Sequence, residues 1–347
     1  LDWDNMVKLL AEAEPAWEVG TRSGYHALTY GYLVGEVIRR VTGLTVNEAL
    51  QREIVEPLGI GGMYIGAPPA VRGDIAEQLV DPKSLDRLFK TTQFMSRFDR
   101  YRPLHSALVI DDIVDVATTE HIHDGEIPAA NGVFTARSLA RMYAALATPD
   151  DFDGPPLVSA ETMREATRIQ TTGDGRTGEK VGRDAAVMFN MRWRLGYHLV
   201  GTTSGVLPRA FGHFGFGGSG AWGDPESGLG AVVLQNGPGH GPNLLCRQVM
   251  RVVSAALEGR DPAAELARIL AVQAAADAAD AADEEDTSDT VEATAPADTP
   301  TPPDPRLAAI VGTYRSHDPW TPTFRIVLRG DVPCQRGDLE DRLVVVG

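Results

Sequence analysis

Two short segments carry groups suited to chemistry at a carbonyl. Tyr25 stands at a loop-to-helix junction, directly after the run GTRSG at residues 20–24. His213 lies in the glycine-rich run GHFGFGGS at residues 212–219. Backbone without side chains lets a substrate carbonyl approach N–H groups, as an oxyanion site requires. Each segment also has a plainer interpretation, a half-buried core tyrosine and a glycine-rich hairpin, so neither indicates a function alone.

Two other patterns point to cofactors, and both fail on context. Residues 215–220 (GFGGSG) fit the Gly-x-Gly-x-x-Gly fingerprint of dinucleotide-binding folds. That fingerprint opens a helix, whereas here it runs into Asp224-Pro225 and another expected strand. Four histidines lack zinc-ligand spacing with cysteine or acidic partners, and we interpret them as core or solvated residues: His105, His121, His123 and His198. We therefore expect neither a cofactor nor a metal.

The elements that must position these segments begin with amphipathic helices. Residues 30–42 are predicted as a helix that ends at Gly43. Its apolar residues share one face, opposite Glu36, Arg39 and Arg40, in the pattern of a helix packed on a core: Leu33, Val34, Val37, Ile38 and Val41. Residues 45–48 (TVNE) predict a capping box that opens the next helix.

Strand patterns follow in the second half of the main region. Residues 191–195 alternate as a half-buried strand does, and residues 209–214 and 229–235 predict two more strands separated by glycine-rich turns. Short consecutive strands joined by tight turns suggest an antiparallel meander. Further helices are expected after Thr135 and over residues 244–257. Helices and strands in separate runs predict an α+β fold.

Charge and composition divide the rest of the chain. The 347 residues carry a net charge of −16, and ten acidic residues but no basic one lie between Arg268 and Arg306. We interpret residues 1–258 as the main domain, 259–305 as an acidic linker rich in Ala, Asp, Thr and Pro, and 306–347 as a partial β accessory domain. An acidic chain does not suit nucleic acid, whose phosphates attract Lys and Arg.

Hydropathy and cysteine content bear on the surroundings of the protein. No run of about 18 apolar residues occurs in the sequence, so we expect no membrane span. Cys246 and Cys334 are far apart, which is neither a disulfide framework nor a metal-ligand cluster. A reducing compartment fits two such cysteines, and we expect a cytoplasmic protein.

Taken in order, the two segments resemble the superfamily of class C β-lactamases, penicillin-binding proteins and related esterases. That family carries Ser-x-x-Lys, then Tyr-x-Asn, then Lys-Thr-Gly or His-x-Gly on an edge strand. Tyr25 matches the tyrosine, and residues 213–215 (HFG) match the third motif. Other residues and short segments that match the family are Gly31, Thr42-Gly43, 56–59 (EPLG) and Asn131-Gly132. The resemblance covers about residues 1–257 and implies a β-lactamase/transpeptidase-like fold, an antiparallel sheet flanked by helices with a helical subdomain.

The resemblance implies acyl transfer by a serine nucleophile, without cofactor. Tyr25 would shuttle a proton to the leaving group, its phenolate favoured by neighbouring cations, and His213 would border the pocket. Because a phenol has an ordinary pKa of about 10, this role requires a shift of several units. The N–H of Phe216 and that of the serine would bind the oxyanion, with Gly215 and Gly217 completing the substrate-binding edge.

Departures from the family pattern define the choice among functions. Ala27 replaces the family's asparagine and His213 its lysine, groups that grip β-lactams and peptides. Their absence favours an esterase or lipase that cleaves small-molecule acyl esters over a β-lactamase or D,D-peptidase, and a non-catalytic ligand-binding homologue is a third hypothesis. No Ser-x-x-Lys occurs in the 347 residues, although residues 177–180 (TGEK) look similar in a polar loop. We expect the motif N-terminal to Leu1, and the chain by itself to be inactive.

Overall fold

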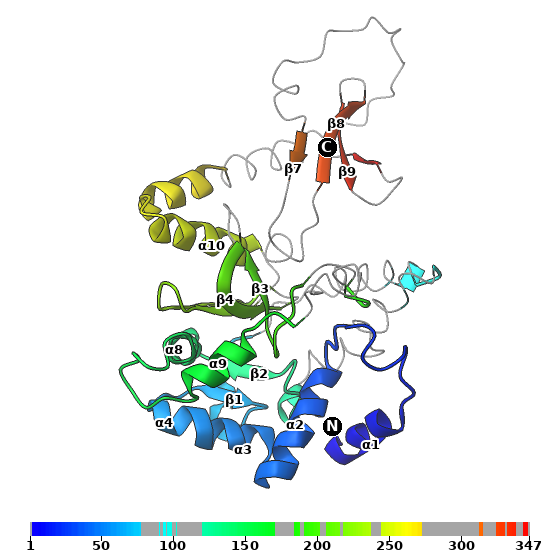
Figure 1. The fold of residues 1–347 in the computed structure, drawn as a ribbon, viewed down its shortest axis with the longest axis vertical. Helices are drawn as coiled ribbons and strands as arrows, with labels where there is room; N and C mark the ends of the chain where they lie inside the picture. The colour runs from blue at the N-terminus through cyan, green and yellow to red at the C-terminus, as the bar shows by residue number, and fades with distance from the viewer. Residues whose placement is uncertain are drawn as a thin grey trace, which may run out of the picture. The chain divides into compact units, whose positions relative to one another are not determined.

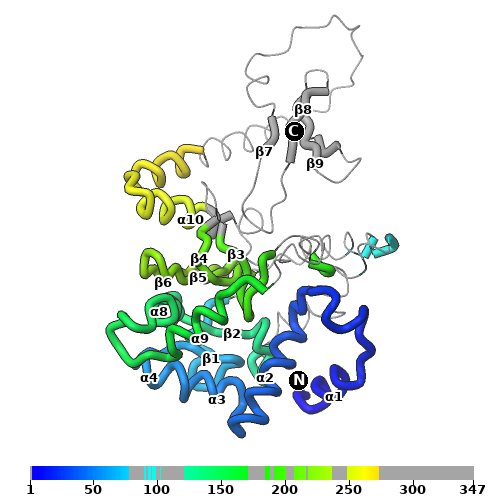
Figure 2. Tube along the Cα trace, in the orientation of Figure 1, coloured from blue at the N-terminus to red at the C-terminus, as the bar shows by residue number. Residues whose placement is uncertain are grey.

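The computed structural model divides the chain into two compact units, which are described separately. Unit 1 comprises Leu1–Val200 and Leu207–Cys246, and unit 2 comprises Gly201–Val206 and Arg247–Gly347. Figure 2 draws in grey the residues whose placement is uncertain. The structure describes residues 2–77, 90, 93–94, 96–98, 102, 120–170, 184–187, 191–201, 206–215, 218–236, 244–272, 312–314, 324–329, 332–337 and 343–345. Tyr25 and His213 both belong to unit 1.

Unit 1 begins with a helical layer whose helix ends follow local sequence signals. Its elements are α1 (Trp3–Glu12), α2 (Thr29–Thr42), α3 (Val46–Leu50), the π-helix η1 (Gln51–Val55) and α4 (Glu56–Leu58) (Figure 1). Gly43 ends α2 in the left-handed region, with φ 73°, and Thr45 and Glu48 form the predicted capping box of α3. The carboxylate of Glu126 also accepts from the first two amides of α3. Both sequence signals are confirmed.

A small sheet connects this layer to the rest of unit 1. Strands β1 (Met63–Ile65) and β2 (Gly132–Phe134) pair antiparallel, and the 3-10 helices η2 (Pro69–Asp74) and η4 (Glu120–His123) lie between them in sequence. The Asn131 side chain braces the approach to β2. Its oxygen accepts from the amide of Ile127, and its nitrogen donates to the carbonyls of Ile122 and Gly125. This buried amide thus fixes the loop that precedes β2.

The main sheet of unit 1 is a meander, as predicted, but it contains only two of the three predicted strands, those over residues 209–214 and 229–235. Its order is β3 (His198–Gly201), β4 (Val206–Phe214), β5 (Gly220–Asp224) and β6 (Leu229–Val233), and the pairs β4–β5 and β5–β6 are antiparallel. Helices α8 (Ala136–Ala147) and α9 (Ala160–Ala166) precede the sheet in sequence, and α8 packs against it. A Cβ on Gly223 would lie 3.0 Å from the carbonyl oxygen of Tyr143, and one on Gly230 would collide with the backbone of Ala140 and Ala144. These glycines let α8 lie directly on the sheet.

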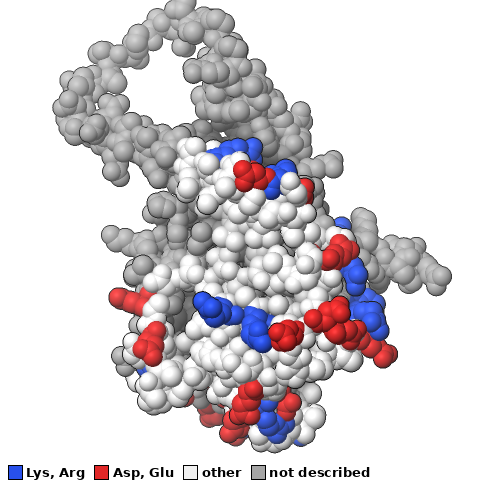
Figure 3. Space-filling view, turned by 90° about the vertical axis from the view of Figure 1, so that its left-hand side faces the viewer, with Lys and Arg blue, Asp and Glu red and all other residues white. Residues whose placement is uncertain are grey.

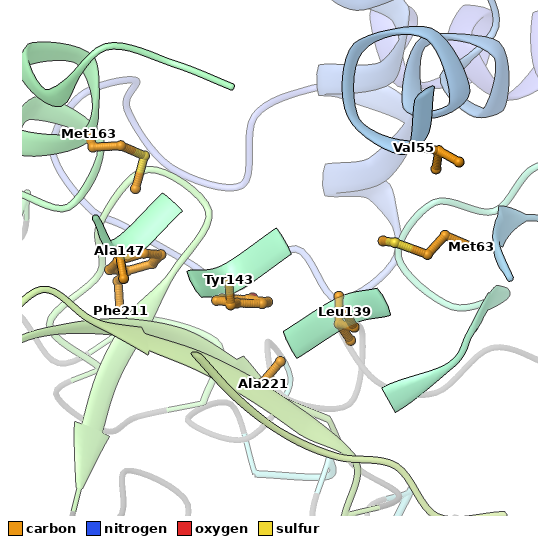
Figure 4. Packing of buried hydrophobic residues seen from close by; sticks show 8 residues of the cluster. All are labelled: Val55, Met63, Leu139, Tyr143, Ala147, Met163, Phe211 and Ala221. Carbon is orange, nitrogen blue, oxygen red and sulfur yellow. The ribbon is translucent and has the colours of Figure 1, made fainter. Parts of the chain in front are cut away.

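The core of unit 1 lies on both sides of α8. Figure 4 shows Leu139, Tyr143 and Ala147 of α8 in the middle of the cluster. Sheet residues, η1 and β1 side chains and an α9 methionine complete it: Phe211, Ala221, Val55, Met63 and Met163. Burial of these apolar side chains is the main force that holds the sheet, α8 and the small sheet together.

Unit 2 contains most of α10 (Leu244–Leu257), a second helix over residues 262–272 and a β-sheet. Glu265 on the second helix is 8% exposed and accepts from the guanidinium of Arg251 at 2.9 and 2.6 Å. The sheet has the order β10 (Leu343–Val345), β9 (Val332–Gly337), β8 (Phe324–Arg329) and β7 (Gly312–Tyr314), each pair antiparallel. The helix over 262–272 falls in the segment interpreted as a linker.

The predicted strand over residues 191–195 is wrong. These residues form a loop, because Arg192 adopts a left-handed conformation with φ 47° that interrupts extended backbone. The loop is held by Arg194, which is 5% exposed and donates to the carbonyls of Thr167 and Pro208. The alternation in the sequence thus comes from a folded loop with buried members, which include Met191 at 1% exposure.

The face of α2 that packs is also not the one that its pattern indicates. The structure buries Gly31, Tyr32, Gly35 and Glu36, whereas the apolar side chains of the expected face are largely exposed, Val37 at 60% and Val41 at 80%. The Trp3 ring of α1 covers Gly35, where a Cβ would lie 2.7 Å from it, and its Nε1 donates to Glu36 at 2.9 Å. Close approach at a glycine and this hydrogen bond determine the buried face.

The surface of the described residues mixes both signs of charge. On the face in Figure 3, Lys and Arg side chains lie beside Asp and Glu, with uncharged surface between the groups. Among the described residues, no helix combines the length and the apolar character that crossing a membrane requires.

Candidate active site

Tyr25 is fixed by contacts on both sides of its loop. Gly24 lies against the ring of Trp17, where a Cβ would come within 2.5 Å of it. The amide of Tyr25 donates to Oδ1 of Asp184 at 3.1 Å, and the amide of Ala185 donates to the carbonyl of Ser23 at 2.9 Å. The loop ahead of α2 is therefore held against residues 184–187 rather than being a free connection.

The Tyr25 ring belongs to a cluster of aromatic and imidazole rings. It is 5.4 Å from the Trp193 ring with an interplanar angle of 10°, and 5.9 Å from the His213 ring with an angle of 26°. His213 in turn lies 4.8 Å from the ring of His198. The structure thus brings together the two residues, Tyr25 and His213, that the sequence singled out from distant segments.

The end of strand β4 carries His213 and leads into the glycine-rich turn. His213 pairs with Ala221 of β5. The amide of Gly215 donates to the carbonyl of Ser219 at 2.7 Å, and its carbonyl accepts from Gly218 at 3.1 Å. The amide of Gly215 is therefore engaged within the turn. Phe216 and Gly217 lie outside the described residues.

The turn between β4 and β5 is a hairpin rather than a dinucleotide site. Strand β5 begins at Gly220, so the glycine run is followed by a strand and not by a helix. Gly218 adopts φ 88°, which only glycine accepts readily. By contrast, among the described residues a Cβ on Gly215 would lie 3.5 Å from the Ser219 oxygen, an ordinary contact distance. Packing therefore does not explain the glycine at position 215.

His198 supports the end of β4 from within the core. Its Nε2 accepts from the amide of Phe214 at 3.0 Å, so the ring proton resides on Nδ1, which lies 2.7 Å from the carbonyl of Leu199. Burial, and then the neighbouring His213, lower the pKa of His198 to about 3. The ring is therefore neutral and able to accept this bond at physiological pH. Sequence reasoning treated His198 as an ordinary core or solvated histidine and missed this contact.

The protonation states of the cluster differ from the expectation for Tyr25. Burial first, and then the charge of Asp184, raise the pKa of the Tyr25 phenol above its ordinary value. The resemblance implied a lowered pKa through nearby cations, and the described surroundings act in the opposite direction. Burial also lowers the pKa of His213 to about 4. Both rings are therefore uncharged near neutral pH.

Two members of the cluster, Asp184 and Trp193, carried no recognised signal in the sequence. Trp193 fell within the mistaken strand, and Asp184 is an acidic residue directly ahead of the apolar run AAVMF at 185–189. An isolated carboxylate in such a run is a usable sign of a buried, hydrogen-bonded acid. Among the described residues, no group of three or more His, Cys, Asp or Glu is arranged to hold a metal ion.

Comparison with known proteins relates this chain to a family. A family model described as Beta-lactamase matches residues 1–254. The chain is 34% identical over 238 residues to the protein named Esterase/beta-lactamase LipL of Mycobacterium tuberculosis. This match covers 68% of the chain and 53% of LipL. The chain therefore spans about half the length of this relative.

Solved structures give the same result. A family VIII carboxylesterase superposes with a TM-score of 0.51 and 30% identity, covering 68% of this chain and 58% of that one. EstA from Arthrobacter nitroguajacolicus Rue61a superposes with a TM-score of 0.57 and 25% identity, covering 74% of this chain and 66% of that one. The α+β architecture of unit 1 is the fold that these hydrolases share.

Proposed function

Because the chain belongs to the beta-lactamase family, we propose that residues 1–258 form part of a serine esterase that cleaves small acyl esters through an acyl-enzyme. One observation carries the proposal: the Tyr25 phenol lies in one ring cluster with His213, two residues ahead of the bare backbone at Gly215. A phenol and a glycine-rich strand end at one place supply a proton-transfer group and room for a carbonyl.

The roles of the residues follow from their protonation states. Tyr25, protonated at neutral pH, donates its proton to the leaving group, and it acts as a base only where a cation offsets its raised pKa. Neutral His213 borders the acyl group and orients Tyr25 or a polar group of the substrate. The amide of Phe216 and that of the serine bind the oxyanion, with Gly215 and Gly217 at the substrate-binding edge.

The nucleophile and its lysine are absent from these residues, since the 347-residue sequence contains no Ser-x-x-Lys. We therefore propose that turnover requires a Ser-x-x-Lys segment in addition to this chain, and that the chain alone is inactive. The lysine of that segment also supplies the cation that Tyr25 needs to act as a base.

The test is turnover of short p-nitrophenyl esters by the protein that includes such a segment. Tyr25→Phe should lower kcat about 100-fold or more with a smaller change in KM, because proton transfer acts in the transition state. Tyr64→Phe on β1 is the matched control, since Tyr64 pairs with Val133 in the small sheet, and should leave both constants unchanged. An unchanged kcat for Tyr25→Phe removes this residue from the mechanism.

A β-lactamase or D,D-peptidase is the second candidate, and the β-lactamase is favoured by the name of the LipL relative, which gives beta-lactamase beside esterase. Ala27 and His213 stand where that chemistry needs an asparagine and a lysine, which favours the esterase. Turnover of a chromogenic cephalosporin without ester hydrolysis would reverse this order. Ligand binding without turnover of either substrate would instead identify a non-catalytic homologue.

A further inference from the structure

A buried carboxylate links two parts of the ring cluster. Asp184 is 1% exposed. Its Oδ1 accepts from the amides of Tyr25, Ala186 and Val187 at 3.1, 2.8 and 2.9 Å, and its Oδ2 accepts from Nε1 of Trp193 at 2.7 Å. A buried carboxylate requires such donors, because an unpaired charge in the interior is strongly unfavourable.

Local turn formation accounts for only two of these four bonds. An aspartate that accepts from the amides two and three residues ahead stabilises its own turn, as Asp184 does with Ala186 and Val187. The bonds from Tyr25 and Trp193 come from residues outside this turn, and Tyr25 belongs to a segment far away in the sequence. They therefore call for a role beyond the turn itself.

Each of the two remaining bonds controls a different part of Tyr25. The bond from the Tyr25 amide fixes the backbone from which the phenol extends. The bond from Trp193 fixes the indole, whose face lies nearly parallel to the Tyr25 ring. From this geometry we infer that Asp184 is a positioning residue, whose carboxylate sets the place and the plane of the Tyr25 phenol. The inference rests on the proposed role of Tyr25.

The electrostatic effect of Asp184 is opposed to phenolate formation. Its charge adds to burial in raising the pKa of Tyr25. The charge of Asp184 therefore does not favour the phenolate, and the contribution that we infer for this residue is geometric. Removal of the charge should lower the pKa of Tyr25 and yet slow the reaction. A lower pKa alone would give more phenolate and would favour a phenol that acts as a base, so a slower reaction points to lost positioning.

Asp184→Asn should keep the bond from the Tyr25 amide and break the bond from Trp193. The amide retains one oxygen that can accept from the backbone amides, but it presents N–H groups toward Nε1 of Trp193, where two donors cannot bond. Asp224→Asn is the matched control. Asp224 is also buried, at 2% exposure, and accepts from the Glu226 amide and the Ser227 hydroxyl within its own turn.

Two readouts report on Tyr25 in the chain itself. The first is near-ultraviolet circular dichroism. The spectrum of the parent, Asp184→Asn or Asp224→Asn chain minus that of the same chain with Tyr25→Phe reports the fixed packing of the Tyr25 ring. The second is the pKa of Tyr25 from tyrosinate absorbance, again by difference from Tyr25→Phe. Asp184→Asn should reduce the dichroism difference and lower the pKa of Tyr25, while Asp224→Asn should alter neither.

Two outcomes would overturn the inference. One is that Asp184→Asn folds by far-ultraviolet circular dichroism and leaves both Tyr25 readouts as in the parent chain. The other is that Asp224→Asn changes them equally. Should Asp184→Asn not fold, Trp193→Phe tests the same link from the other side, because it keeps a ring but removes the donor to Oδ2. An unchanged Tyr25 titration in Trp193→Phe would then refute the role.

Turnover distinguishes this inference from the proposed function. In the protein that includes Ser-x-x-Lys, Asp184→Asn should lower kcat about 100-fold with a smaller change in KM, the size of effect that a misplaced reacting group produces. Absence of turnover in the parent protein refutes the esterase, while the two spectroscopic readouts still judge whether Asp184 holds Tyr25.

Discussion

The apolar core around α8, called here the α8 layer, and the cluster around Tyr25 are both buried parts of unit 1, but they are built from different groups. The first consists of apolar side chains such as Phe211, Leu139 and Met63. The second buries Asp184 and His198, each bound to backbone amides. In the first region, the shape of a side chain determines whether it fits. In the second region, its hydrogen-bonding capacity and its protonation state do so. Substitutions and pH should therefore affect the two regions differently.

The largest effect is expected from Phe211→Ala in the α8 layer. Phe211 is 0% exposed and packs against Tyr143 and Tyr197 at centroid distances of 6.0 and 5.0 Å. Removal of the ring should lower the free energy of unfolding by about 3–5 kcal/mol, measured by urea denaturation. Phe98→Ala is the control, because Phe98 is 52% exposed and should change it by less than about 0.5 kcal/mol. Equal effects would mean that this layer is not the core.

A smaller effect is expected where α8 meets the sheet. Gly230→Ala places a Cβ against the backbone of Ala140 and Ala144, which cannot move without shifting the helix. The free energy of unfolding should fall by about 1–3 kcal/mol. Gly73→Ala is the matched control, since a Cβ there meets nothing within 4 Å among the described residues. A stable Gly230→Ala protein would show that α8 is not held at this distance.

Mild acid should act on the cluster rather than on the apolar layer. Unfolded chains bind a proton at His198 below its ordinary pKa of 6.5, whereas the folded state does so only near 3. Stability from this site is thus complete above about pH 6.5 and falls as pH drops toward 3, by about 1.4 kcal/mol per pH unit. His198→Gln places an amide oxygen near Nε2 and does not titrate.

The measurement is the free energy of unfolding at several pH values between 4 and 7 for both chains. The slope of the parent chain should exceed that of His198→Gln by the amount that one histidine contributes. Parallel slopes would show that His198 takes up its proton equally in both states.

Local signals in the sequence correctly predicted the helix ends at Gly43 and Thr45 and two strands of the meander, but not the loop over residues 191–195. The Gly43 stop and the Thr45 capping box depend on residues within one turn, so a single sequence contains them. The buried face of α2 does not, because it is decided by Trp3 of another helix, which packs on Gly35 and binds Glu36. Amphipathic pattern predicts that a helix has two faces, and tertiary contacts decide which one is covered.

The candidate site shows the same limit. Motif order brought Tyr25 and His213 into one hypothesis, and the structure places their rings 5.9 Å apart. The bonds that Asp184 and His198 accept from the backbone amides of Tyr25 and Phe214 could not be predicted, because no residue pattern records which distant amide a side chain will meet. A bond from a side chain to distant backbone depends only on the fold, so sequence spacing alone cannot predict it.

The smallest effect on stability, and the one that separates structure from function, is expected at Gly215. Its Cβ would make only an ordinary contact with Ser219, so Gly215→Ala should change the free energy of unfolding by less than about 0.5 kcal/mol. Gly212→Ala, in contrast, collides with Ala221 and Trp222 on β5 and should destabilise the sheet. If the bare backbone at 215 admits a carbonyl, Gly215→Ala should still lower kcat/KM for short esters in the protein that carries Ser-x-x-Lys. Loss of stability at 215 would assign the glycine to the hairpin, and unchanged turnover would place the substrate elsewhere.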